Sequence, residues 1–518
     1  MNDHGPHRHE GLMPHIGASG SQIGAAIALI FGVLVGVMSY VLLGQTGLTM
    51  VMTLLGMVVI GSVVSYIAWH NFAFLVAAWL FSMSGFRSYA MLYMPFLPDI
   101  SIDRVFSLWV MLMFAVRLLM RKDRIQGPYL VDILFLLHAA YILANTMYIG
   151  SRAHTHEWAL SSMTPLVGYL MGKNIICRER ELRFLFKFFA VLMIYYAVQS
   201  IAQKFRLDIL VWPKTTLDLH MGLHHTGRSR GPFLHPPLFG QIMAMLVPIQ
   251  FYLFFRFKSK LSRGLILIAL GVSCLGLFYT YTRAPWVACM AGFLTLAIMR
   301  PRYRQLIIGS GIIVAVAAFF GVAHLVQSDA DFFHDRLTNM WTVKNRLAAI
   351  SASIRIWRDN PMFGVGFFNW DDVYGLYRRG EEILFFGYIE RHAGDGVRIH
   401  DIYFGRLAEE GIISLGLLSA VFIAIWLRFK KLWAMVAEPD VLNRDGLAVV
   451  AAILVTYLVG GAGIDFRYFD MVNAIPYLLV GVLYGYQVPH HPPPPPPYRL
   501  WTPPYFSRRD GGDEPSGA

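Results

Sequence analysis

The chain has 518 residues, of which 56% are hydrophobic and only 15% are charged. Because a soluble globular protein carries about 25% charged residues, this composition excludes an ordinary soluble enzyme. The formal net charge is +12, but most of the excess lies in short loops between apolar segments. The positive-inside rule accounts for such loops, so the charge does not indicate nucleic-acid binding. Only three cysteines occur, which predicts neither a disulfide framework nor a cysteine metal site.

Apolar stretches long enough to cross a bilayer recur along most of the chain. They predict an all-α integral membrane protein, a polytopic bundle of about 12–14 transmembrane helices. The spans are expected near residues 22–44, 47–69, 71–86, 101–120, 129–149, 158–176, 184–203, 237–255, 264–281, 284–299, 305–326, 407–427, 446–464 and 470–488. The third and tenth are short, so the lower counts also fit.

Two polar tails flank the membrane domain that we expect over residues 22–488. Residues 1–21 contain four histidines and do not read as a cleavable signal peptide, and we interpret them as a solvated tail rather than a metal site. Residues 489–518 begin with a proline-rich stretch that contains the run Pro492–Pro497. This tail is interpreted as an extended spacer, with docking on an aromatic groove as the alternative.

Clusters of Arg and Lys follow every second span, and the positive-inside rule places those loops and both termini in the cytoplasm. The clusters are Arg121–Arg124, Arg178–Arg183, Arg256–Arg263, Arg300–Arg304 and Arg428–Lys431. The opposite face then holds residues 204–236, a tight turn at 282–284, the long loop 327–406 and a turn at 463–470. Within the long loop, Ile350, Ile354 and Trp357 have helical spacing, which predicts an amphipathic helix that ends before Pro361.

Three arginines on this opposite face are candidates for binding phosphate, since the planar guanidinium binds phosphate oxygens in a bidentate manner. Arg283 stands at a turn between two apolar helices, where a charge is costly and function is a reasonable default. A headgroup anchor or a snorkelling side chain is the alternative. Of Arg228 and Arg230, we prefer Arg230 because it directly precedes Gly231 and Pro232.

His400 lies where the long loop re-enters the membrane and is a candidate general base, since histidine titrates near neutrality. A structural role fits the spacing equally well. Asp401 is either part of the site or the N-cap of the following helix. Glu409 and Glu410 follow on that helix and could face the same cavity.

Four segments read together resemble the O-antigen ligase and O-antigen polymerase superfamily, polytopic glycan transferases of the GT-C type. They are GRSRGPFLHPPLFG, YTRAPWVACMAGF, RIWRDNPMFGVGFFNW and HDIYFGRLAEEGIISLGLL, and the resemblance covers about residues 180–430. The most specific element is matched by His400, Asp401, Tyr403, Glu409 or Glu410, and Gly411. Two positions depart from the family pattern: His235–Pro237 replaces an Asn-Pro-Asn-like segment, and Asp401 replaces the commoner Asn.

The resemblance implies a membrane glycosyltransferase without a metal or another cofactor that inverts the anomeric centre. Arg230 and Arg283 would bind an undecaprenyl-pyrophosphate-linked glycan donor on the periplasmic face of a bacterial inner membrane, and His400 would activate an acceptor hydroxyl. Arg228, Asp401, Tyr403, Glu409 and Glu410 complete the expected substrate-binding set.

Several acceptors fit this reading. If the acceptor is a lipid core, the enzyme is a ligase. If it is another lipid-linked repeat, the enzyme is a polymerase of O-antigen or exopolysaccharide. If it is a protein hydroxyl or amide, the enzyme is a protein-directed transferase. Polysaccharide-assembly partners and membrane lipids are the expected contacts. The alternative of another class is a transporter or flippase for lipid-linked oligosaccharides. Transporters place functional charges near the bilayer midplane and show repeated halves, neither of which is apparent here.

Overall fold

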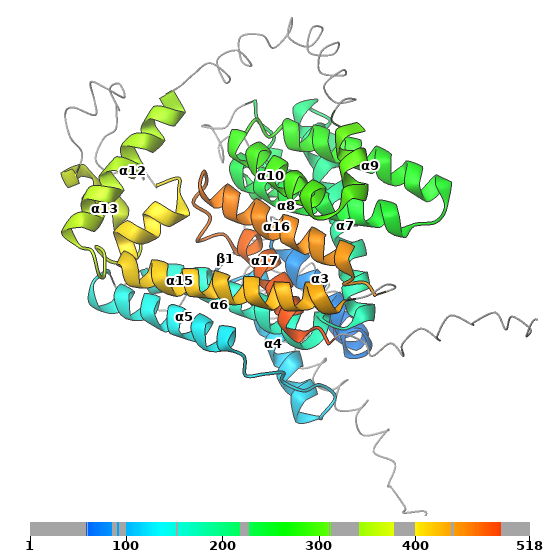
Figure 1. The fold of residues 1–518 in the computed structure, drawn as a ribbon, viewed down its shortest axis with the longest axis horizontal. Helices are drawn as coiled ribbons and strands as arrows, with labels where there is room; N and C mark the ends of the chain where they lie inside the picture. Colours follow the sequence, from blue (N-terminus) through cyan, green and yellow to red (C-terminus); the bar gives the residue numbers. More distant parts are fainter. Residues whose placement is uncertain are drawn as a thin grey trace, which may run out of the picture.

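The computed structural model describes residues 61–84, 100–151, 154–217, 227–309, 341–377, 399–436 and 440–487, together with residues 59, 91–92 and 311. The expected span 22–44, most of the spans 47–69 and 305–326, and both tails lie outside the described residues. The described part is almost entirely helical (Figure 1). Its β-structure is one short antiparallel pair, β1 (Met91–Leu92) with β2 (Ile100–Ser101).

The α-helices are α3 (Phe72–Ser82), α4 (Ile102–Leu119), α5 (Leu130–Tyr148), α6 (Thr155–Met171), α7 (Glu179–Lys204), α8 (Pro236–Arg256), α9 (Lys260–Phe278), α10 (Arg283–Met299), α12 (Trp341–Asp359), α13 (Trp370–Tyr377), α15 (Ile402–Met435), α16 (Arg444–Gly461) and α17 (Asp470–Gly485). Among them α5, α7, α8, α9, α15 and α16 are long and apolar enough to cross a membrane, and α3, α10 and α17 are shorter apolar helices. The all-helical membrane class expected from the sequence is confirmed.

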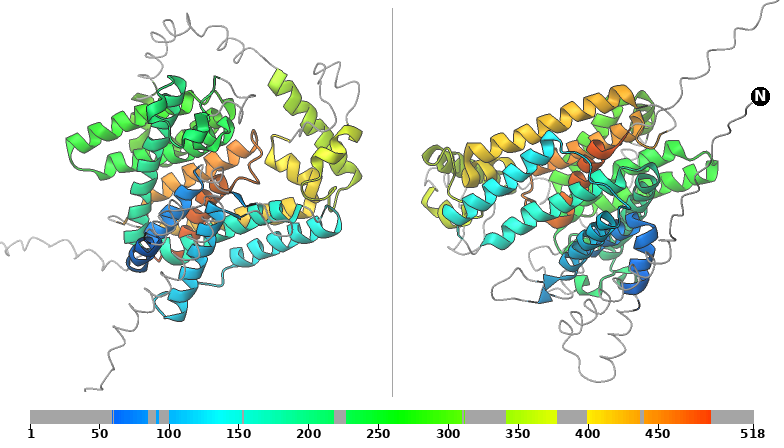
Figure 2. Two further views of the ribbon diagram at one scale, coloured as in Figure 1. Left: turned by 180° about the vertical axis from the view of Figure 1, so that it is seen from behind. Right: turned by 90° about the horizontal axis from the view of Figure 1, so that it is seen from below.

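Helices α8 and α17 form the centre of the bundle (Figures 1 and 2). Every residue of α17 except Tyr477 is buried, as is nearly all of α8. In contrast, α9 leaves Leu261, Leu265 and Ile268 exposed. A helix that is apolar all round but exposed is what a lipid-facing position requires, so the bundle has a protein-packed interior and a rim of helices for contact with lipid.

Small residues let α17 pack closely against α6. Gly172 begins the π-helical turn η3 (Gly172–Ile176) that ends α6, and a methyl group there would overlap the backbone carbonyl of Leu478. On α17, a methyl group at Gly485 would overlap the carbonyl of Lys173. Close backbone approach at glycine is the usual means of helix association in membranes, where the hydrophobic effect contributes little between helices.

The bundle has two ends that differ in their side chains. The end that we call the basic-loop end holds Arg117 and Arg178, both paired with Asp123, and Lys173, whose Nζ lies 2.8 Å from Oδ1 of Asp132. It also includes the last turn of α10 and the start of α16. The other end, here the arginine end, holds the first residues of α10, α15 and α17. By the positive-inside rule the basic-loop end is predicted to be cytoplasmic.

At the arginine end, α12 and α13 pack against the start of α15 (Figure 1). The expected helix before Pro361 is α12, and the face that it packs against the protein differs from the face of Ile350, Ile354 and Trp357. Ala349, Ala352 and Ile356 are buried, whereas Ile350, Ile354 and Trp357 are only half-buried. The alanines face inward because a small side chain allows the backbone of α12 to approach α15 closely.

Candidate active site

A kink divides α15 at Gly411, whose φ of 72° and ψ of −172° interrupt the helical backbone. The backbone amide and carbonyl groups that lose their helical partners at the kink form hydrogen bonds with the turn that follows α12. The amides of Val365 and Gly366 donate to the carbonyls of Ala408 and Glu409 at 3.0 and 2.9 Å, and the Ile412 amide donates to the carbonyl of Pro361 at 3.0 Å. Because buried backbone groups require partners, this turn holds the kink in place.

Glycine is required on both sides of this contact. Gly364 has a φ of +68°, and a Cβ there would overlap the backbone of Glu409. A Cβ on Gly411 would overlap the backbone of Met362 in the same way. Left-handed backbone is accessible to glycine at little cost, and the absent side chain permits the approach. The two most family-like segments of the sequence, NPMFGVG and the element that follows His400, therefore pack directly on each other.

Five charged side chains form a buried ion cluster where the first part of α15 meets the α16–α17 turn: Arg406, Glu409, Glu410, Asp465 and Arg467. An Arg467 guanidinium nitrogen lies 2.6 Å from Glu409 and another lies 2.8 Å from Asp465. Arg406 pairs with Glu410 at 2.8 Å. Glu409 and Glu410 are thus engaged by protein groups, so the expected role in substrate binding stays a prediction without direct support from their contacts.

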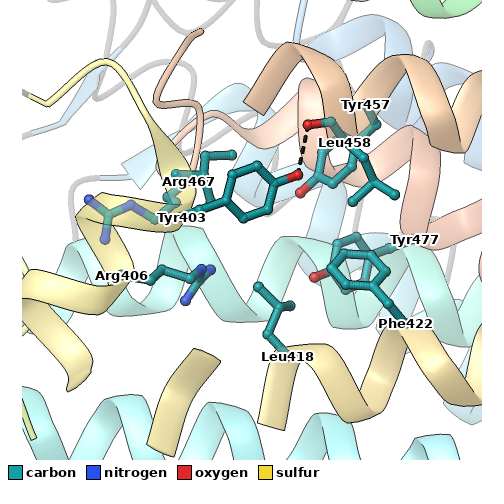
Figure 3. A pocket seen from close by; sticks show the side chains of 9 residues that line it. Tyr403, Arg406, Leu418, Phe422, Tyr457, Leu458, Arg467 and Tyr477 are labelled. Carbon is teal, nitrogen blue, oxygen red and sulfur yellow. Dashed lines mark hydrogen bonds between the residues drawn. The ribbon is translucent and has the colours of Figure 1, made fainter. Parts of the chain in front are cut away.

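Tyr403 lies beside this cluster and lines a small cavity together with Arg406 (Figure 3). The hydroxyl of Tyr403 donates to the Leu458 carbonyl at 2.7 Å, which ties α15 to α16. Arg467, Tyr457 and Tyr477 complete the polar lining. This contact gives Tyr403 a structural task, in addition to the substrate-binding role expected from the resemblance.

Arg283 is the first residue of α10, directly after the N-cap Thr282. The Arg228 side chain reaches the same turn, donating to Oγ1 of Thr282 at 2.5 Å and to the Thr280 carbonyl at 3.2 Å. The Arg230 side chain instead donates to the carbonyl of Thr216 at 3.2 Å. The structure therefore brings Arg228, rather than the preferred Arg230, to the turn that carries Arg283.

A third arginine, Arg346 of α12, lies beside Arg283. Burial and the nearby positive charge of Arg283 lower the pKa of the Arg346 guanidinium. Within the described residues the Nε of Arg346 is buried without a hydrogen-bond partner. Two guanidinium groups that face each other repel unless an anion lies between them. We call Arg228, Arg283 and Arg346 the arginine site.

His400 is exposed and is connected to the arginine site through α12. Its neighbour Ile399 is buried in a cluster with Ala349 and Ala352 of α12, and Arg346 precedes Ala349 by three residues on the same helix face. On its other side, Asp401 caps α15, accepting from the Phe404 amide at 2.8 Å. The N-cap alternative for Asp401 is confirmed as a contact, and it fixes the backbone next to the histidine.

Within the described ranges, no three His, Cys, Asp or Glu side chains come together as metal ligands. The chemistry without a metal that the resemblance implies stays a prediction. The arrangement offers two neighbouring guanidinium groups, and a histidine whose neighbour Ile399 packs on the helix that carries Arg346.

Residues 268–418 match the family model described as O-antigen ligase. This match supports the resemblance to the O-antigen ligase and polymerase superfamily over that part of the chain. The matched region runs from α9 into α15 and contains Arg283, Arg346, His400 and the kink at Gly411. The match is consistent with a membrane protein of the glycan ligase and polymerase type in general. No curated protein matches the chain in sequence.

Arg346 is the site residue that the sequence reasoning missed, and a signal for it was present. It stands three residues before Ala349, on the buried face of the amphipathic helix α12. An arginine on the buried face of a helix is unusual and indicates either an ion pair or a ligand. The more apolar residues Ile350, Ile354 and Trp357 lie on another face of the helix and obscure this signal in the sequence.

Proposed function

We propose that the protein transfers a glycan from a lipid-linked diphosphate donor to an acceptor hydroxyl at the arginine end of the bundle. Arg283 and Arg346 bind the diphosphate, Arg228 supports Arg283 through the Thr282 turn, and His400 is the general base. This end faces the periplasm of a bacterium in the proposal, and the undecaprenyl carrier follows from the family.

One observation carries the proposal. Two arginines from distant parts of the chain lie side by side at the start of α10, with the Nε of Arg346 lacking a hydrogen-bond partner within the described residues. Such an arrangement is costly by itself and becomes favourable when a polyanion bridges the two groups. A diphosphate is the anion that a glycan donor brings to the membrane surface.

In the proposed reaction the acceptor oxygen attacks the anomeric carbon of the donor sugar. The bond between that carbon and the diphosphate oxygen breaks, and its electron pair leaves with the lipid diphosphate. The hydroxyl proton passes to His400, which must be neutral to accept it. Negative charge grows on the leaving group in the transition state, and fixed guanidinium groups stabilise it there more than in the ground state.

The transporter alternative draws support from the buried ion cluster, because charges within a membrane helix often belong to a transport path. In the cluster, however, Arg467 and Arg406 are each paired at hydrogen-bond distance with carboxylates. Paired charges that hold a kink and a turn together favour a scaffold for the neighbouring histidine. The transferase is therefore the function proposed here.

The proposal is tested by reconstituting the full chain in liposomes with a lipid-diphosphate-linked glycan and measuring transfer to an acceptor. Arg346→Ala should lose at least about 100-fold in rate, as does removal of one donor to a developing oxyanion elsewhere. The matched control is Arg358→Ala on the same helix, since Arg358 is exposed. Equal rates for Arg346→Ala and Arg358→Ala, or movement of the intact donor across the membrane without transfer, would contradict the proposal.

The acceptor class is tested separately in cells. Surface glycans of a deletion strain are resolved by chain length. Long chains that remain on the carrier lipid identify a ligase, single repeats identify a polymerase, and unmodified proteins identify a protein-directed transferase.

A further inference from the structure

A second cavity opens at the arginine end, between the ends of four helices. Its volume is about 130 Å³, smaller than that of a site for a drug-sized ligand. Apolar side chains form most of its lining, among them Phe233, Leu238 and Phe469. Two carboxylates, Asp103 and Asp470, are its charged groups.

One carboxylate oxygen of the buried Asp103 has no partner among the residues that the structure describes. Its side chain is 3% exposed, and within the described residues Oδ1 has no hydrogen-bond partner and the carboxylate forms no ion pair. Asp470 differs, since its Oδ1 accepts from the Thr164 hydroxyl at 2.9 Å. A buried carboxylate that lines a cavity and has nothing to accept from is costly to maintain. This cost is removed when a ligand supplies a hydrogen-bond donor.

The chemistry of the cavity restricts the ligand. The N-terminal ends of α4 and α17 lie at the cavity, and the partial positive charge of helix N-termini disfavours a cation. The two carboxylates disfavour an anion. A neutral group that both donates and accepts hydrogen bonds satisfies both features, and the hydroxyl groups of a sugar have this property. The apolar lining suits the carbon–hydrogen face of a sugar ring.

Two loops of the chain each run from the arginine site to the cavity. Phe233 lies shortly after Arg228 and Arg230. The turn from Gly463 to Asp470 begins next to Ala284 and Arg346 and ends in the cavity lining. Helix α8 separates the two places, since Gly240 packs against Pro285 on one side while Leu238 and Ile242 line the cavity. A helix is about 10 Å across, which an oligosaccharide attached to the diphosphate can span.

We propose that this cavity binds a sugar residue of the lipid-linked glycan through its hydroxyl groups, with Asp103 accepting from one of them. The site would make the enzyme selective for the glycan as well as for its diphosphate carrier. This inference rests on the proposed function for the identity of the ligand, but its test has readouts that do not depend on transfer.

The first experiment measures thermal unfolding of the full chain in detergent without added glycan. Asp103→Leu should raise the melting temperature, because it removes an unpartnered buried charge at a site kept for binding. Asp103→Asn, which keeps a carbonyl acceptor, should have a smaller effect. A melting temperature that falls in Asp103→Leu would mean that the carboxylate stabilises the free protein, and the proposal would be wrong.

The second experiment places the photocrosslinking amino acid p-benzoylphenylalanine at Phe233 in cells that make lipid-linked glycans. The probe is that cellular glycan pool, and adducts are identified by carbohydrate staining and mass spectrometry. We expect an adduct that contains sugar at Phe233, at least about tenfold weaker after Asp103→Leu, since a hydrogen bond to a charged group is lost. The control position is Leu265 on the exposed face of α9.

An adduct without sugar at Phe233, or a sugar adduct unaffected by Asp103→Leu, overturns the inference. The two proposals fail separately. A sugar adduct in a protein that transfers no glycan contradicts the proposed function and leaves the cavity assignment in place. Transfer that depends on Arg346 without any sugar adduct at Phe233 contradicts the cavity assignment and leaves the proposed function in place.

Discussion

The two ends of the bundle use arginine differently. At the basic-loop end, Arg117 and Arg178 share Asp123, and Arg300 pairs with Asp445. At the arginine end, Arg346 faces Arg283, and its Nε has no hydrogen-bond partner within the described part of the chain. Selection for stability alone would favour paired charges, because an unpaired buried charge lowers the free energy of unfolding. Under the proposed function, the comparison separates arginines that hold the fold together from arginines that bind the donor.

The largest effect on glycan transfer is expected from a substitution of His400. His400→Ala should lower glycan transfer about 10²- to 10⁴-fold, because the acceptor proton loses its base. Protein level and melting temperature should not change, since His400 is exposed. The control is His70→Ala, which removes another exposed histidine before α3. Near-normal transfer by His400→Ala would sink the assignment of the base.

At the basic-loop end the expected effect is on stability. Asp123→Asn removes the shared partner of Arg117 and Arg178 and should destabilise the protein by about 3–5 kcal/mol, the usual consequence of breaking a buried ion pair. Transfer per folded molecule should stay unchanged. Asp372→Asn, at an exposed position of α13, is the control. If Asp123→Asn lowered transfer without lowering the melting temperature, the distinction between the two ends would not hold.

At the arginine end the expected effect is on activity. Arg283→Lys should reduce transfer about 100-fold, because an ammonium group cannot reproduce the bidentate geometry of a guanidinium on phosphate. The melting temperature should stay level, since lysine keeps the positive charge. A lysine variant with full activity would instead favour the headgroup-anchor interpretation of Arg283.

Asp401 gives the smallest expected effect. Asp401→Ala should cost about 1 kcal/mol through loss of the N-cap, whereas Asp401→Asn should retain both stability and transfer because asparagine caps equally well. Melting temperature and transfer rate of the two variants measure this. Loss of transfer in Asp401→Asn at unchanged stability would return Asp401 to the substrate-binding set.

The membrane class was predictable, as were the helices at 130–148, 179–204, 236–256, 260–278, 402–435 and 444–461, because apolar length is a local property of the sequence. The helix before Pro361 was also predictable. Its buried face was not, because Ala349 and Ala352 are less apolar than Ile350 and Ile354, and only the distance to α15 makes them the packing residues.

The site was partly predictable for a related reason. Arg283 and His400 stood at positions where a charge needs an explanation, and the resemblance supplied one. The pairing of Arg467 with Glu409 joins the α16–α17 turn to α15, and because α16 lies between them in the chain, no spacing rule could reveal it. Likewise the choice between Arg228 and Arg230 depended on where a loop turns rather than on the residue that follows each arginine.

The kink at Gly411 has a consequence for how the enzyme would respond to bilayer thickness. Much of α15 after the kink is exposed, and a long exposed helix adjusts to hydrophobic mismatch by tilting. The outer segment that starts after His400 is bonded to the turn at 361–366 and not to a continuous helix. We therefore expect the tilt of α15 to vary with lipid length while the histidine keeps its position.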